Sequence, residues 1–118
     1  TASVPHIKSG KFRALANFGS QPITALPGLP SFATEADLPG FDAGVWLGVV
    51  APAGTPPAVV NKLQQEVTRA LALPDVKEKL IGVGLEPMPS TAAEFAAFIK
   101  KEAERSEPII LKAGIRLD

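Results

Sequence analysis

An uncharged apolar run at residues 45–51, followed directly by a turn and a pair of prolines, constrains the fold of this chain more than any other feature. The run is rich in strand-forming residues and is bounded by a glycine and a proline. Ala53-Gly54 then predicts a tight turn, and Thr55 can cap a helix that has Pro56 at its first position. The sequence therefore predicts a buried strand, a turn and the start of a helix.

The chain before this run is rich in turns and in proline. A short helix is predicted to end at Gly10, a strand is predicted over Phe12–Phe18, and the prolines of residues 19–30 exclude a helix there. Ser31 can cap a further short helix over Phe32–Asp37. The first third of the chain is thus predicted to be mostly irregular.

The chain after the run is predicted to hold three main helices. The first carries apolar residues at helical spacing, namely Val59, Val60, Leu63, Val67 and Leu71. Pro74 starts the second helix, which covers Asp75–Val83, and Thr91 and Glu94 form a capping box at the start of the third. The third helix is expected to bury Phe95, Phe98, Ile99 and Ala103, to bend at Pro108 and to end at Gly114.

Composition narrows the class of protein and of partner. A chain of 118 residues corresponds to about one domain. Its twelve basic and twelve acidic residues balance, which gives no electrostatic reason to expect nucleic acid as a partner. There is no cysteine, which fits an oxidising compartment, and no apolar run reaches the ~20 residues of a membrane span.

No catalytic or metal constellation is recognisable in the sequence. One histidine and no cysteine cannot form the usual zinc site, and His6 is interpreted as a surface residue. Glu35, Asp37 and Asp42 flank a loop but have no partner base or nucleophile, so solvated carboxylates are the favoured interpretation. A hydrolase or isomerase is therefore disfavoured, and no cofactor is expected.

Five segments resemble one family in register. The strongest match is Trp46–Pro56 (W-L-G-V-V-A-P-A-G-T-P). The first segment is Pro5–Ala16 (P-H-I-K-S-G-K-F-R-A-L-A), and the second is Leu26-Pro27 with Phe32–Glu35. The remaining two are residues 91–99 and 112–115. The chain thus resembles the solute-binding proteins of tripartite tricarboxylate transporters, also called Bug proteins. Two departures are Ser106-Glu107, where the family often has a Trp, and the Asn17–Ser20 stretch after the first predicted strand.

The resemblance implies an α/β protein that is the C-terminal part of a two-domain periplasmic-binding-protein (type II) fold. Residues 1–42 would be the end of the second lobe and the approach to the hinge. Residues 43–118 would supply the returning strand and the C-terminal helices of the first lobe. Such proteins are periplasmic, close on small carboxylates and deliver them to membrane permease subunits, and they are not enzymes.

The same resemblance suggests where a solute would be bound. A strand entered from a hinge begins at the edge of the cleft, which favours Phe41, Ala43 and Trp46 as ligand-binding residues and disfavours an anion site at Gly54-Thr55. Core packing is the competing interpretation for the two aromatic side chains. The family's glycine-rich loops, which hold the solute carboxylate, would lie upstream of Thr1, so this polypeptide alone is expected to bind solute weakly.

Two further expectations concern self-association and an alternative function. A severed half of such a protein would expose apolar surface, so a homodimer of the fragment is expected. The alternative function is a stand-alone α/β interaction domain without a small-molecule ligand.

Overall fold

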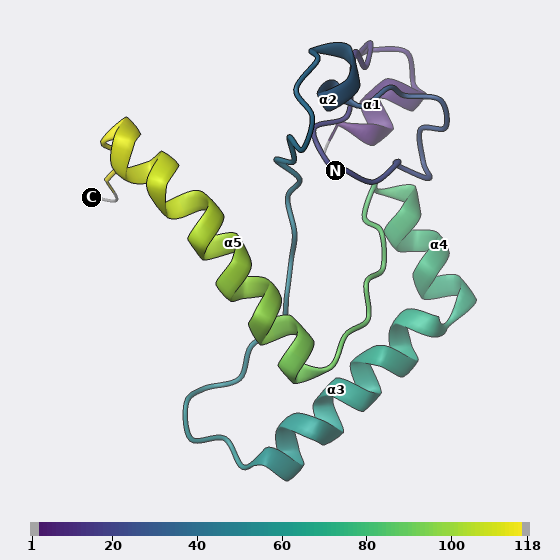
Figure 1. Ribbon diagram of the computed structural model, residues 1–118. Coiled ribbons are helices and arrows are strands. Elements are labelled where there is room, and N and C mark those ends of the chain that lie inside the picture. The colour runs from purple at the N-terminus through teal and green to yellow at the C-terminus, as the bar shows by residue number, and fades with distance from the viewer. Residues whose placement is uncertain (1–2, 117–118) are drawn as a thin grey trace.

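The computed structural model describes residues 3–116 and shows five helices joined by long irregular stretches (Figure 1). Two short helices, α1 (Val4–Lys8) and α2 (Phe32–Glu35), lie in the N-terminal third of the chain. Three longer ones follow, namely α3 (Pro57–Ala72), α4 (Pro74–Gly82) and α5 (Ala92–Ala113). The predicted set of three C-terminal helices is therefore confirmed.

Several helix ends follow from single residues. Pro74 is the first residue of α4, where its missing N–H group costs no hydrogen bond. Thr91 and Glu94 satisfy each other's backbone N–H groups in a complete capping box at the start of α5. Gly114 ends α5 in the left-handed conformation, with φ at 65°. These three predictions are confirmed.

The start of α3 differs from the prediction. The helix begins at Pro57, one residue later than expected, and Pro56 is its N-cap. Thr55 does not cap α3, because its hydroxyl donates a hydrogen bond to the carbonyl oxygen of Pro52 at 2.8 Å and so closes the preceding turn instead. The predicted capping role of Thr55 was therefore wrong.

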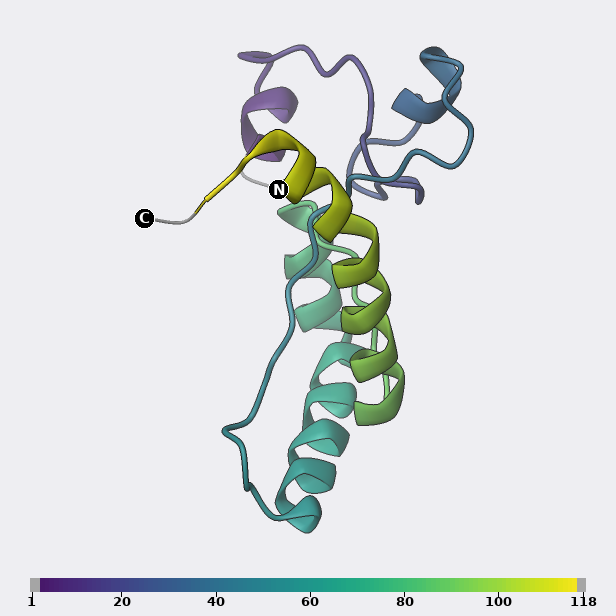
Figure 2. The same ribbon diagram turned by 60° about the vertical axis from the view of Figure 1, so that its left-hand side comes forward.

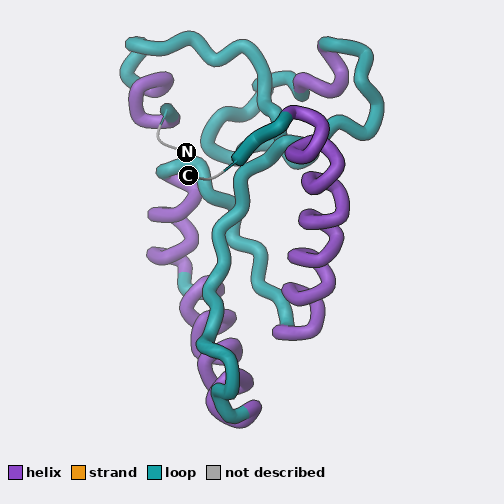
Figure 3. The backbone as a smooth tube through the Cα atoms, turned by 90° about the vertical axis from the view of Figure 1, so that its left-hand side faces the viewer, coloured by secondary structure: helices purple, strands orange, loops and turns teal. Residues whose placement is uncertain are grey.

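Neither predicted strand forms within residues 3–116, where only an isolated parallel bridge joins Asn17 to Ser31 (Figure 3). A strand needs a neighbour that accepts and donates backbone hydrogen bonds. Residues 45–51 make no backbone hydrogen bond to any described residue, and Val45, the first of the run, is 87% exposed. The prediction of a buried strand at residues 45–51 was wrong for this chain by itself, because no other described segment pairs with its backbone.

The molecule is open for its length. Its accessible surface is 9364 Å², whereas a compact protein of this mass exposes about 6,100 Å². Its radius of gyration is 17.0 Å, against about 13.5 Å for a compact domain of this size. None of the described helices has the length and apolarity that crossing a membrane requires.

The helices pack along their apolar faces but bury them incompletely. The principal helix contacts join α3 to α4 and α3 to α5. In Figure 2 α4 follows α3 along the molecule, whereas Figure 1 shows α5 diverging from α3 toward its C-terminal end. Phe95, Phe98 and Ile99 of α5 were predicted to be buried and are only half-buried, and Ala103 is exposed. Among described residues only Val4 is fully buried, so the apolar faces of the helices meet without enclosing a hydrophobic core.

Candidate functional site

Residues 41–46, called the crossover below, join the N-terminal third of the molecule to the extended run before α3 (Figure 1). The segment contains all three residues that sequence reasoning assigned to the solute site.

Phe41 belongs to an N-terminal aromatic cluster with Phe18 and Phe32. Its ring centroid lies 5.9 Å from that of Phe18 and 5.1 Å from that of Phe32, and the other two rings stack at 4.6 Å. Such offset and edge-on pairs stabilise beyond the apolar area that they bury. Phe41 thus anchors the start of the crossover to the N-terminal part of the molecule.

Trp46 belongs to a second, C-terminal aromatic cluster with Phe95 and Phe98 of α5. Its ring meets theirs edge-on, with centroids 5.9 Å and 5.3 Å away. The side chain still exposes 42% of its surface. Trp46 is therefore positioned by packing and retains a face that can contact another molecule.

Ala43 lies between the two clusters. Its backbone N–H donates to the carbonyl oxygen of Phe18 at 2.9 Å, and its side chain is exposed. The three predicted residues share one short segment, but Phe41 and Trp46 pack in different clusters at its two ends. Each has a packing role whether or not it also contacts a solute.

Asp42 organises the polar side of the crossover. Its carboxylate accepts the backbone N–H of Gly44 at 3.0 Å. Hydrogen bonding from the Ser20 side chain, then from the Gly44 amide, holds the pKa of Asp42 below its ordinary value of 3.8, and the nearby charge of Arg105 acts in the same direction. Sequence reasoning treated Asp42 as solvated, and the structure instead places it in a set of local hydrogen bonds.

Arg105 connects α5 to the crossover. One terminal nitrogen of its guanidinium donates to the backbone carbonyl of Asp42. The other donates to the carboxylate of Glu102, one helical turn earlier, at 2.5 Å. A single side chain of α5 therefore holds both a neighbour on its own helix and the backbone of the crossover.

The sequence did not single out Arg105, because the charged residues at 100–105 are typical of an exposed helix face with ion pairs four residues apart. One such pair does form, between Lys100 and Glu104. The available signal was helical spacing, since Glu102 continues the inner stripe of Phe95, Phe98 and Ile99. A charged residue on the inner stripe of a helix is a candidate for a specific polar contact.

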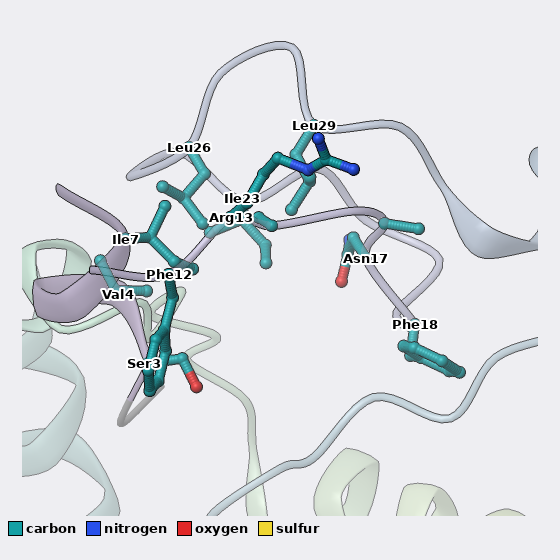
Figure 4. A pocket seen from close by; sticks show the side chains of 12 residues that line it. Ser3, Val4, Ile7, Phe12, Arg13, Asn17, Phe18, Ile23, Leu26 and Leu29 are labelled. Atoms are coloured by element: carbon teal, nitrogen blue, oxygen red, sulfur yellow. The ribbon is translucent and has the colours of Figure 1, made fainter. Parts of the chain in front are cut away.

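A hollow of about 450 Å³ lies within the N-terminal third of the molecule (Figure 4). Its lining is mostly apolar and includes Val4, Ile7, Phe12, Ile23, Leu26 and Leu29. Arg13 is the one charged residue that lines it, and the amide of Asn17 is engaged by the carbonyl oxygens of Gly19 and Gln21. This lining suits apolar side chains better than a small carboxylate.

No metal-binding cluster is found among the described residues. Residues 3–116 contain no group of three or more His, Cys, Asp or Glu side chains that could hold a metal ion. His6 is exposed and its ring lies 5.1 Å from that of Phe12, which agrees with the surface role expected for it.

Comparison with known proteins assigns these features to a family. The model of the tripartite tricarboxylate transporter family receptor matches residues 1–115. The UPF0065 protein in the tcbD-tcbE intergenic region of Pseudomonas sp. (strain P51) is 36% identical over 112 residues, which are 95% of this chain and 33% of that protein. Protein BugT of Bordetella pertussis is 34% identical over 116 residues, 98% of this chain and 35% of BugT.

Another relative is shorter. The UPF0065 protein in the clcB-clcD intergenic region of Pseudomonas knackmussii is 33% identical over 111 residues, which are 94% of this chain and 66% of that protein. The chain thus spans about a third of the length of most of the curated relatives that it matches.

Proposed function

The chain belongs to the tripartite tricarboxylate transporter receptor family, and on that premise we propose that it is part of a periplasmic receptor that captures small carboxylates for a tripartite transporter. The observation that carries the proposal is the match over residues 1–115, together with the similarity to BugT along 98% of the chain. The membrane permease subunits of the transporter are the proposed partners. The proposed role is binding and delivery, without catalysis.

We further propose that the rest of a longer receptor polypeptide covers the open faces of this chain. Residues 1–42 would then belong to the second lobe and residues 43–118 to the first. Support comes from the run at residues 45–51, because exposed contiguous apolar surface marks a place where another surface packs. The relatives are about three times as long as the segment that aligns with this chain, so a receptor of that length has enough additional polypeptide to cover these faces.

The proposed solute contacts are Phe41, Ala43 and Trp46. They lie on the segment where the two proposed lobes meet, and Trp46 retains 42% of its surface for contact. In the full-length receptor, we expect Phe41→Ala and Trp46→Ala each to weaken solute binding roughly three- to tenfold, the loss typical of one aromatic contact. Phe12→Ala removes an exposed phenylalanine far along the chain from the crossover and is the matched control.

Titration calorimetry of the full-length receptor with mono-, di- and tricarboxylates tests the proposal, with the corresponding neutral amides as controls. Saturable binding of a carboxylate but not of its amide is expected. Binding of none of them would refute the carboxylate assignment, and turnover of ester or phosphate substrates would refute a pure binding role. The 118-residue chain alone should bind far more weakly, and tight binding by it would contradict the division into lobes.

A stand-alone interaction domain is the second candidate, and the same exposed run favours it.

In either case we propose that the isolated chain self-associates, because Leu47 and Val49 each expose 75% of their surface on the run. Light scattering should show a dimer or larger species that Leu47→Lys and Val49→Lys diminish. Met88→Lys, at an apolar residue 74% exposed outside the run, should have little effect. A clean monomer at high concentration would contradict self-association.

A further inference from the structure

Few polar side chains connect residues 3–42 to the helices that follow. The principal helix packing joins α3 to α4 and to α5, and α1 and α2 have no comparable interface with them. Side-chain hydrogen bonds span the division at two places, between Thr24 and Glu86 and between Arg105 and Asp42. The orientation of the N-terminal part therefore depends strongly on these two links.

The first link is a two-point contact on one carboxylate. One oxygen of Glu86 accepts the backbone N–H of Thr24 at 2.7 Å, and the other accepts the Thr24 hydroxyl at 3.0 Å. Hydrogen bonds to an ionised acceptor are about twice as strong as neutral ones. This link holds the loop before α2 against the connection between α4 and α5.

The second link is held from both sides. The Glu102 side chain is only 18% exposed, and its bond to Arg105 fixes the plane of the guanidinium while the other nitrogen reaches Asp42. Lysine has no planar fork and could not make both contacts in this way. The link therefore requires arginine, and not merely a positive charge.

The crossover is stiff where Arg105 holds it. Asp42 closes a short turn onto the Gly44 amide, and the Ala43 amide is bound to Phe18. The backbones of Gly19 and Gly44 approach closely, since a Cβ on Gly44 would lie 3.5 Å from the Cα of Gly19. The position of the Asp42 carbonyl is therefore coupled to that of the loop at residues 17–20.

We propose that Arg105, held by Glu102, and the Thr24–Glu86 pair form a two-point clamp that sets the orientation of residues 3–42 relative to helices α3–α5. Two separated links restrict rotation that a single link would leave free. In a receptor whose parts must be aligned before solute binds, a clamp that already holds them aligned lowers the conformational entropy that is lost on binding. Arg105 and Glu86 are then positioning residues for solute affinity, a consequence that rests on the proposed function.

Distance measurements between spin labels test the clamp without any solute. The 118 residues carry no cysteine, so within this chain labels attach only at Glu35→Cys on α2 and Gln65→Cys on α3, both exposed positions. Any cysteine elsewhere in the full-length receptor is replaced by serine. Arg105→Gln with Glu86→Gln should broaden the distance distribution, and Arg105→Lys should broaden it partly. Lys101→Gln and Glu78→Gln, at exposed positions on α5 and α4, are the matched controls.

Circular dichroism of each variant should show unchanged helix content, because neither link lies within a helix cap. An unchanged width of the distance distribution in the double variant would overturn the clamp. A broadened distribution should be accompanied by a roughly 3- to 10-fold loss of carboxylate affinity, and unchanged affinity would overturn the positioning role. If the unmodified receptor binds no carboxylate, the proposed function fails while the distances still decide whether the clamp exists.

Discussion

At the scale of single residues, Gly48 shows how closely the extended run lies on α5. A Cβ built at Gly48 would stand 2.1 Å from the Cζ atom of Phe95, a separation that requires the ring to move. Because that ring is also packed against Trp46 and Phe98, we expect Gly48→Ala to destabilise the full-length receptor by about 1–3 kcal/mol, the usual cost of overpacking. Urea denaturation measures the change.

Gly82→Ala is the matched control for that substitution. A Cβ at Gly82 meets nothing within 4 Å, and the residue ends helix α4 with an ordinary backbone conformation. Alanine there should leave stability unchanged or raise it, because glycine is the poorer helix former. Equal urea midpoints for the two variants would show that the run does not rest on Phe95.

The Asp42 carboxylate predicts a dependence of stability on pH. Its pKa is lower in the folded state than its ordinary value of 3.8, owing chiefly to Ser20 and to the Gly44 amide. The ionised form therefore stabilises the fold at pH values above 3.8, and this contribution is lost as the pH falls through the lowered folded-state pKa. Asp42→Asn should be less stable than the unmodified receptor at pH 7, and the difference should shrink toward pH 3.

Urea midpoints of the two proteins between pH 7 and pH 3 measure this difference. Glu78→Gln, which removes a carboxylate at an exposed position of α4, is the control. A gap between Asp42→Asn and the unmodified receptor that widens as the pH falls would have the wrong sign and would rule out the assigned hydrogen bonds.

At the scale of helices, the capping box of α5 is the most local determinant of structure. The Glu94 amide donates to the Thr91 hydroxyl at 3.2 Å, and the Glu94 carboxylate accepts the Thr91 amide at 2.8 Å. We expect Thr91→Ala to cost about 1 kcal/mol, the typical loss for an N-cap. Thr91→Ser keeps the hydroxyl and should cost far less, and equal thermal shifts for both variants would contradict a capping role.

Predictions from sequence succeeded where the cause was local. Pro74, the Thr91–Glu94 pair and Gly114 each fix a helix end through bonds within a few residues, so the boundaries of α4 and α5 could be predicted closely. The prediction of a buried strand at residues 45–51 was wrong for this chain by itself, because the pairing of a strand depends on a neighbour distant in sequence. Arg105 was missed for the same reason, since its acceptor lies 63 residues away.

At the scale of the whole molecule, the open shape predicts that residues 45–51 behave differently in the isolated chain and in the full-length receptor. None of these residues makes a backbone hydrogen bond here, and the surface of the molecule exceeds that of a compact protein of its mass. We propose that the missing neighbours are strands elsewhere in the receptor. The run has the composition of an interior strand, uncharged and rich in valine.

Hydrogen exchange followed by mass spectrometry distinguishes the two states. In the 118-residue chain, the amides of residues 45–51 should exchange within seconds, while the hydrogen-bonded amides of α5 exchange much more slowly. In the full-length receptor, the same run should become at least as protected as α5, because a strand paired on both sides opens only with its sheet. Rapid exchange of the run in both proteins would mean that no neighbouring strand covers it, and the assignment of this chain to one part of a two-lobed receptor would have to be abandoned.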